Sequence, residues 1–232
     1  MEPNRTLDRC PYCHGNLYRL SGGMCKCAAC RKKFSPKKLL RDFDVIARFC
    51  RGETARKASK ETGMSYQSVT ARYARLRLLA AAHLEAAYEA ERDTIGEFEE
   101  YIYLEASKRH DKRHIFDAHN FITFDYGGRV YNLLMPSLRR FKQEFIDDGL
   151  ERLYYEQFSR FLRIHRIAKV EKNQNTITAF WDFFETQIAR YKGIRPENFP
   201  YYLKEAEFKF NYDEEEQIEI LTQKWLFDDA LT

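Results

Sequence analysis

The feature that most restricts the fold of this chain is a pair of cysteine motifs near its N-terminus. Cys10 and Cys13 form one Cys-x-x-Cys pair, Cys27 and Cys30 form a second, and thirteen residues separate the two pairs. This spacing is typical of a zinc ribbon, in which two short turns bring four thiolates into a tetrahedron around Zn²⁺. A Gly-Gly pair lies between the motifs, where the chain must reverse. We therefore predict a structural zinc site with these four cysteines as its ligands.

A redox role is the main alternative for a Cys-x-x-Cys motif. A thiol–disulfide enzyme needs only one such pair, however, and no βαβ pattern surrounds either motif. Cys25 is a possible substitute ligand, although it lies too close to Cys27 to form a knuckle of this type with it. Cys50 shares an apolar helical face with Val45 and Phe49, and we expect it in the core.

The composition excludes several broad classes of protein. With 232 residues, of which 44% are hydrophobic, the chain is long enough for one sizeable core and a small accessory module. No stretch approaches the roughly eighteen apolar residues of a membrane span, and the N-terminus lacks the apolar core of a secretory signal. We expect a cytoplasmic protein without a membrane partner, in which the cysteines stay reduced and free for metal.

Charge is distributed very unevenly along the chain. The formal net charge is +4, yet residues 1–80 contain eighteen Lys or Arg against six Asp or Glu, which is +12, so the remainder sums to −8. Such polarity is typical of a basic N-terminal region that binds nucleic acid, joined to a body with a different role. A basic face that is merely solvated is the alternative.

A second module follows the cysteine motifs. After Pro36 the apolar residues recur at helical spacing and the pattern is broken at Gly52 and Gly63, which predicts three helices. A helix from Thr54 to Thr62, a short turn and a new helix capped by Ser65 are typical of a helix-turn-helix. The alternative is a three-helix bundle with a basic surface.

The last helix of this module would be the recognition helix. If Val69, Tyr73 and Leu76 face inward, a different set of side chains is left for duplex DNA. Gln67 is suited to a base edge, and the arginines are suited to guanine or phosphate. The candidate DNA-binding residues are Tyr66, Gln67, Ser68, Arg72 and Arg75.

The rest of the chain alternates between strand and helix patterns. Residues 81–95 continue as a helical connector, and the strand after Gly96 should face inward with Phe98, Ile102 and Leu104. A hairpin is expected around Gly127-Gly128, and an amphipathic helix within "TITAFWDFFETQIARYK".

The acidic segment 213–232 is expected to form a helix that packs on the protein, shields the basic region or binds a partner.

Six segments together resemble a known family. They are "CPYC", "CAACRKKFS", "FDYGGRVYNLLMP", "NTITAFW", "ARYKGI" and "ENFPYYLKEAEFKFN", in this order. The chain resembles the bacterial insertion-sequence transposases that carry a zinc ribbon, a helix-turn-helix and an RNase H-like DDE domain. The resemblance implies a multidomain fold whose third part is an α/β domain with a mixed sheet flanked by helices. The corresponding ranges are 1–37 for the zinc ribbon, 38–80 for the helix-turn-helix and 81–95 for the helical connector. The RNase H-like domain then covers 96–212, and the acidic tail covers 213–232.

In that family three acidic residues hold two divalent metal ions, Mg²⁺ or Mn²⁺, and a lysine follows on the helix of the third acid. Here the first position reads Glu100 or, in the other register, Tyr101, and the second falls near Glu156. The third is Thr178, and the lysine position is Glu185. Glu100 and Glu156 are therefore weak catalytic candidates, and Asp111 and Asp125 are acids that could be recruited in their place.

These departures leave the question of enzymatic activity open. We expect a bacterial, nucleoid-associated protein that binds double-stranded DNA, could form a homo-oligomer, and has a degenerate catalytic site. An active metal-dependent transposase with diverged ligands is the alternative. A third class, a zinc-ribbon protein that contacts only other proteins, is disfavoured by the basic N-terminal region.

Overall fold

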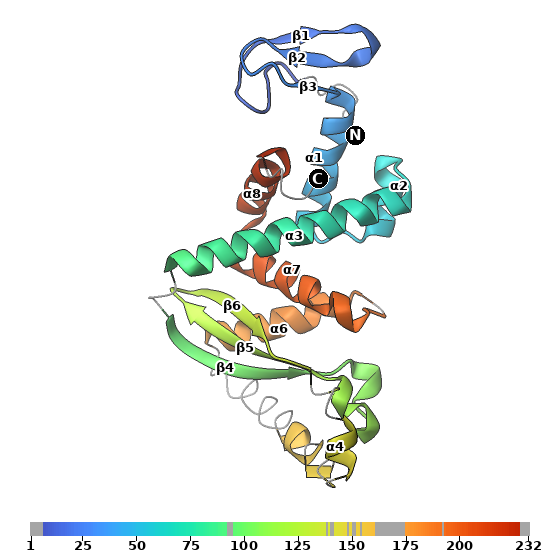
Figure 1. Cartoon of the computed structure of the whole chain (residues 1–232), viewed down its shortest axis with the longest axis vertical. Coiled ribbons are helices and arrows are strands. Elements are labelled where there is room, and N and C mark those ends of the chain that lie inside the picture. The colour runs from blue at the N-terminus through green and yellow to red at the C-terminus, as the bar shows by residue number, and fades with distance from the viewer. Residues whose placement is uncertain are drawn as a thin grey trace. The chain divides into compact units, whose positions relative to one another are not determined.

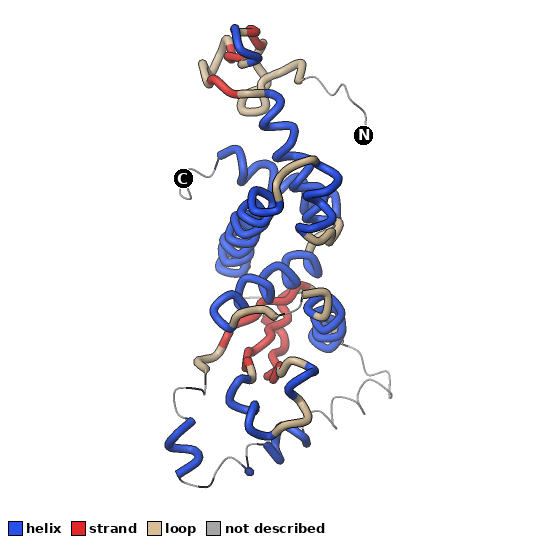
Figure 2. The backbone as a smooth tube through the Cα atoms, turned by 90° about the vertical axis from the view of Figure 1, so that its right-hand side faces the viewer, coloured by secondary structure: helices blue, strands red, loops and turns tan. Residues whose placement is uncertain are grey.

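The computed structural model describes residues 7–91, 95–137, 139, 142–147, 149, 152–153, 155–160, 175–191 and 193–227. The chain divides into two compact units. Unit 1 comprises Met1–His83 and Tyr212–Thr232, and unit 2 comprises Leu84–Asn211. The described strands occur in two places, a small N-terminal sheet and a second three-stranded sheet packed with helices (Figure 2). The fold is therefore mixed α/β.

Unit 1 begins with a three-stranded antiparallel sheet that holds the cysteine motifs. Its strands are β1 (Leu17–Arg19), β2 (Cys25–Cys27) and β3 (Lys33–Phe34), paired in the order β1-β2-β3. The predicted reversal lies between β1 and β2, where Gly22 and Gly23 both have positive φ, 72° and 73°. Glycine adopts this conformation without the steric cost that a Cβ would add.

Three helices follow, as predicted. They are α1 (Pro36–Cys50), α2 (Ala55–Thr62) and α3 (Tyr66–Glu91). The side chains of Ser35, Thr54 and Ser65 accept backbone N–H bonds at the three helix starts. Gly63 ends α2 in the left-handed conformation, with φ of 68°. The expected helical connector has no start of its own, because α3 runs without a break through Glu91.

The acidic segment near the C-terminus folds back onto unit 1. It forms α8 (Glu214–Phe227), which packs along α1 (Figure 1). Leu221 is fully buried, and Leu226 joins the apolar cluster that contains Cys10 and Phe34 of the ribbon. Of the three roles expected for this segment, packing on the protein is confirmed.

Unit 2 is built on the strands β4 (Ile95–Tyr103), β5 (His119–Tyr126) and β6 (Arg129–Leu134), paired in that order. The predicted hairpin is confirmed, because Gly127 and Gly128 connect β5 to β6 with φ of 63° and 85°. All three described strands are antiparallel, so the mixed sheet implied by the family resemblance stays a prediction.

Helices α6 (Thr176–Ile188) and α7 (Phe199–Asn211) pack against this sheet (Figure 1). The shared core contains Tyr101, Phe121 and Val130 from the strands and Phe180, Trp181, Phe184, Phe199 and Leu203 from the helices. Two short helical segments, η3 (Ala106–Lys108) and η4 (Lys112–Asp117), connect β4 to β5. A third, η6 (Pro196–Asn198), precedes α7, and the helix α4 (Lys142–Asp147) follows β6. Helical periodicity from Leu138 to Phe145 in the sequence predicts a helix in the region of α4, and the first of these residues, Leu138, lies outside the described residues.

One sequence-based prediction about β4 was wrong. Phe98 was expected to face inward, but it is 66% exposed, while Tyr101 on the opposite face is 1% exposed. Ile102 does contact buried residues, in a smaller cluster with Leu104 and Phe116. Because β4 places aromatic or aliphatic side chains on both faces, alternation alone could not identify the face that α6 covers.

Candidate functional site

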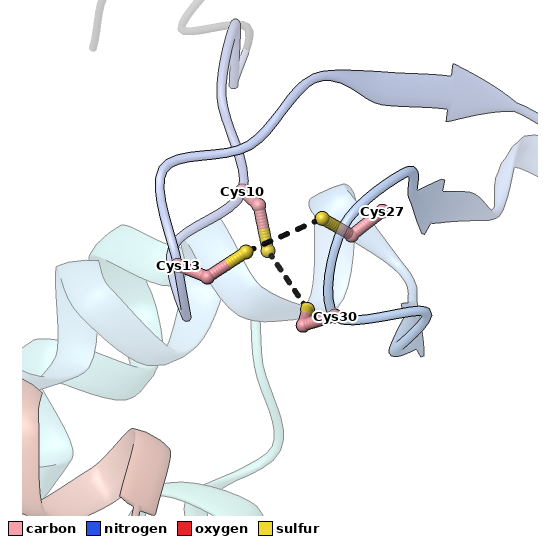
Figure 3. Close-up of side chains that lie close together, drawn as sticks. All are labelled: Cys10, Cys13, Cys27 and Cys30. Carbon is pink, nitrogen blue, oxygen red and sulfur yellow. Dashed lines mark hydrogen bonds between the residues drawn. The ribbon is translucent and has the colours of Figure 1, made fainter.

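The four predicted zinc ligands lie together in unit 1. All four Sγ atoms are within 4.8 Å of one another, with Cys10 3.7 Å from Cys30 and Cys13 3.4 Å from Cys27. Figure 3 shows the thiols converging from two loops. Four sulfurs bonded to one tetrahedral zinc at about 2.3 Å would be separated by about 3.8 Å. The cluster therefore has the ligand set and the size of a structural zinc site.

The two loops that carry the cysteines have the same local geometry. The N–H of Cys10 donates to the carbonyl of Gly15 over 2.9 Å, and the N–H of Cys27 donates to the carbonyl of Lys32 over 3.1 Å. The residue after each motif, His14 and Arg31, has positive φ, 57° and 61°. This repeated turn points the two thiols of each motif to the same side, which is what a shared metal ion requires.

Gly15 shows how tightly the cluster is enclosed. A Cβ added there would lie 3.1 Å from the Cβ of Ala29, 3.2 Å from the Sγ of Cys27 and 3.4 Å from the Sγ of Cys13. A larger residue would therefore push one loop away from the other, and the sulfurs would separate.

The environment of the thiols differs from one cysteine to the next. Burial raises the pKa of the Cys10 thiol to about 12. Burial also acts to raise the pKa of Cys27, but hydrogen bonds from the backbone N–H of Cys30, from the Cys13 thiol and from the N–H of Ala29 outweigh it and lower this pKa to about 6. The Cys27 thiolate, which is the form that binds metal, is thus favoured near neutral pH. Cys25 is buried in the same apolar cluster, and Cys50 is buried in α1 as predicted.

The start of α3, the helix predicted to read DNA, presents part of the predicted DNA-binding set to solvent. Val69, Tyr73 and Leu76 of α3 are buried, as predicted. Tyr66 is 57% exposed and Gln67 is also exposed, so both side chains are accessible at the start of α3. Ser68 is half-buried, and its hydroxyl lies 2.9 Å from that of the capping residue Ser65.

The two arginines of that set are engaged within the chain. Nε of Arg72 donates to Asp42 over 2.7 Å, and its Nη1 donates to the carbonyl of Ser68 over 3.1 Å. The guanidinium of Arg75 lies over the ring of Trp225 in α8, 4.3 Å from the ring centroid. Neither contact could be read from the local sequence, because the partners are 30 and 150 residues away.

In unit 2, two of the positions that the family resemblance identified as catalytic lie against each other. The hydroxyl of Tyr101 on β4 donates to Oε1 of Glu185 on α6 over 2.7 Å, and Nη2 of Arg109 donates to the same oxygen over 2.9 Å. Burial raises the pKa of Tyr101 far above its usual value, and the Glu185 carboxylate raises it further. Tyr101 is therefore a neutral hydrogen-bond donor here, and not a nucleophile.

Thr178, at the position of the third acid, caps α6. Its N–H donates to Oδ1 of Asn175 over 2.9 Å, and its hydroxyl oxygen accepts the N–H of Asn175 over 3.0 Å. The Nδ2 of Asn175 in turn lies 3.2 Å from Glu97 and 3.4 Å from Glu99. Thr178 thus has a structural role at the helix start, next to two carboxylates of β4.

The two weak catalytic candidates are not part of this arrangement. Glu100 alternates with Glu99 and Tyr101 along β4, so it lies on the face opposite α6 and is exposed. Glu156 is exposed on the helical residues 155–160 and pairs with Arg152 over 3.3 Å. Among the described residues, no group of three or more cysteine, histidine, aspartate or glutamate side chains other than the four cysteines comes close enough to share a metal ion. Tyr154, beside the second acid position, lies outside the described residues.

Sequence reasoning missed Arg109, which completes the contact between Tyr101 and Glu185. It follows β4 in a basic loop, where its charge indicates a solvated or phosphate-binding side chain. Its Nε donates to the carbonyl of Leu104 over 2.7 Å, which holds the guanidinium against the sheet. Only the closure of the β4–β5 connection over the end of α6 brings it there.

Comparison with known proteins gives one partial similarity. An uncharacterized transposase-like protein of Haemophilus influenzae (strain Rd) is 38% identical over 71 residues, which is 29% of this chain and 57% of that relative. The matched part thus spans little more than half the length of the relative. No family model matches the chain, and no solved structure matches it. Within the described residues, no helix is long and apolar enough to cross a membrane.

Proposed function

We propose that this chain is a DNA-binding protein descended from transposases. In this proposal the cysteine cluster holds a structural zinc ion, and the helix-turn-helix binds double-stranded DNA. Unit 2 is an RNase H-like domain that has lost the two-metal chemistry of its ancestors. The partial similarity to a transposase-like protein supports the ancestry, and the cysteine cluster supports the zinc-dependent module.

The observation that carries the proposal is the contact between Tyr101 and Glu185. The family resemblance implies an aspartate at the first acid position, which is Tyr101 in one of the two registers, and a lysine at the position of Glu185. Here a neutral donor has replaced the acid and a carboxylate has replaced the cation, and the two replacements are hydrogen-bonded to each other. A metal ion at this place would meet the neutral Tyr101 hydroxyl and the positive charge of Arg109. The one carboxylate of this contact, Glu185, is already bonded to both of these groups.

DNA binding is supported by the charge and exposure of unit 1. Residues 1–80 have a net charge of +12, and Tyr66 and Gln67 are exposed at the start of α3. In a helix-turn-helix the first residues of the second helix reach the base edges, and Gln can pair with adenine through two hydrogen bonds.

Binding is tested with the full chain on duplex DNA from the region that flanks its own coding sequence. We expect affinity to fall steeply with salt, because Lys and Arg displace condensed counterions from phosphate. Gln67→Ala should reduce the preference for the bound sequence by about 1–3 kcal/mol, with little effect on random DNA. Thr70→Ala, an exposed change on the same helix, is the matched control. Absence of binding by the zinc-loaded chain would refute this part of the proposal.

The alternative, an active transposase with diverged ligands, has one observation in its favour. Glu97 and Glu99 place two carboxylates beside Asn175, on the face of β4 that also carries Tyr101. A DNA cleavage and strand-transfer assay with Mg²⁺ or Mn²⁺ distinguishes the two functions. We expect no cleavage of the flanking ends. Metal-dependent nicking that is lost in Glu97→Gln and Glu99→Gln would establish the alternative.

A further inference from the structure

Helix α8 contacts cationic side chains of unit 1 with its last turn. The ring of Trp225 lies 4.3 Å from the guanidinium carbon of Arg75, within the range of a cation–π interaction. The ring of Phe227 lies 5.8 Å from Nζ of Lys32 in the zinc ribbon, and packs edge-on against Tyr12 at 5.9 Å. Two cations from separate parts of the basic region thus lie against one end of α8.

The first turn of α8 makes a contact of the same kind. Oε1 of Glu214 accepts a hydrogen bond from Nε of Arg51 over 3.0 Å, and both side chains are about half exposed. The helix also has a charge opposite to its surroundings. Its residues 214–227 include four glutamates, all exposed, against one lysine. A DNA phosphate that approaches Arg51 or Arg75 would therefore meet negative charge.

Arg75 lies on the side of α3 that matters for DNA. At about 100° per residue, Arg75 is roughly 80° around the helix axis from Gln67 and about 100° from the buried Leu76. It thus lies on the flank between the exposed face and the core, which fits its half-buried state. Trp225 covers this flank, while Gln67 stays exposed.

The residues that attach α8 to unit 1 are different from those that contact the cations. Leu221 and Leu226 are buried, whereas Glu214 and Phe227 are each more than half exposed. The apolar side chains account for the attachment of the helix, because burying a leucine side chain removes a large apolar surface from water. The contacts with cations contribute little to attachment, since exposed ion pairs are weak.

We infer that α8 is an autoinhibitory helix, which competes with DNA phosphate for Arg75, Arg51 and Lys32. This inference rests on the proposed DNA-binding function. The occupied cations reduce binding to any duplex, while the exposed base-reading residues are left free. The helix therefore weakens binding to all duplex sequences by a similar factor, because phosphate contacts are common to specific and non-specific complexes.

The decisive experiment replaces Trp225 in the full, zinc-loaded chain. Trp225→Leu removes the aromatic ring but keeps an apolar side chain, and Trp225→Phe keeps a ring face. We expect Trp225→Leu to bind random duplex DNA about three- to tenfold more tightly than the original chain. The slope of log affinity against log salt should become steeper by about 0.9, the value for one further phosphate contact. Trp225→Phe should lie close to the original chain, and in an Arg75→Ala background Trp225→Leu should have no effect.

A surface pair tests the same idea without a change in packing. Glu214→Gln releases Arg51, whereas Glu215→Gln makes the same charge change next to it, at a side chain for which the described structure shows no ion pair. We expect about twofold tighter binding for Glu214→Gln than for Glu215→Gln.

The outcomes separate the two proposals. If the original chain binds DNA but Trp225→Leu, with full zinc content, binds equally or more weakly, α8 is only a packing element and the inference is overturned. Equal binding by the two glutamine variants would also count against it. If no variant binds DNA, the proposed function itself fails, and the inference fails with it.

Discussion

The cysteine cluster of unit 1 and the Tyr101–Glu185 contact of unit 2 lie at the two places where the family resemblance predicts metal ions, and the side chains present at these places are very different. At the first, the complete ligand set is present, and the sulfurs lie within 4.8 Å of one another. At the second, Tyr101 donates a hydrogen bond to Glu185, which stands at the lysine position, and Thr178 is hydrogen-bonded to the capping residue Asn175. Under the proposal, the small sheet of unit 1, which has few apolar residues, would depend on bound zinc for its folding, whereas unit 2 has a large aromatic core of its own.

The cluster should therefore respond most strongly to the loss of one ligand. Cys27→Ser should release the zinc ion and unfold the ribbon, because metal binding in so small a module supplies about 10–16 kcal/mol of folding free energy. Metal analysis and limited proteolysis of residues 7–35 measure the two effects. Cys25→Ser, a buried cysteine outside the cluster, is the matched control and should retain its zinc. A full zinc content in Cys27→Ser would show that the ligands are not those assigned.

The Tyr101–Glu185 contact should respond less. Tyr101→Phe removes one hydrogen bond to a carboxylate that keeps Arg109 as a partner, so the free energy of unfolding should fall by about 1–2 kcal/mol. Denaturant unfolding provides the measurement. Tyr103→Phe is the matched control, because this tyrosine lies on the same face of β4 and its hydroxyl has no hydrogen-bond partner among the described residues. Equal effects of the two changes would show that the contact with Glu185 does not stabilise unit 2.

The smallest expected effect is that of Mg²⁺ or Mn²⁺ on the intact protein. An ion that binds only the folded chain raises the melting temperature in proportion to the logarithm of its concentration over its dissociation constant. We expect no measurable rise in melting temperature at about 1 mM of either ion. At that concentration a site with a micromolar dissociation constant would add roughly 4 kcal/mol to the free energy of unfolding. A rise that disappears in Glu97→Gln would mean that unit 2 has kept a metal site, and the contrast between the two places would no longer hold.

Many of the local features could be predicted from the sequence. Gly63 and the capping residues Thr54 and Ser65 specify where helices begin and end, because these effects act within four residues. The same is true of the Gly127-Gly128 turn and of the two Cys-x-x-Cys turns. For this reason the cysteine cluster, the turn between α2 and α3 and the β5–β6 hairpin all follow from short stretches of the chain.

The interior of unit 2 was less predictable. Phe98 and Tyr101 are both aromatic residues on β4, and nothing within the strand distinguishes the exposed one from the buried one. The difference arises because α6, more than seventy residues later in the chain, covers one face only.

The sequence alone indicated the ligand set of the proposed zinc site and the helix boundaries of unit 1. Through the family resemblance it also indicated departures from the catalytic pattern, with Tyr101 or Glu100 and Thr178 at acid positions and Glu185 at the lysine position. The tertiary structure decided what these residues and their neighbours contact: Tyr101 meets Glu185, Arg72 meets Asp42, and Arg75 meets Trp225. The physical reason is range. Caps, turns and metal knuckles are set by hydrogen bonds and dihedral angles between near neighbours, whereas these three contacts form only after separate elements pack together and exclude water.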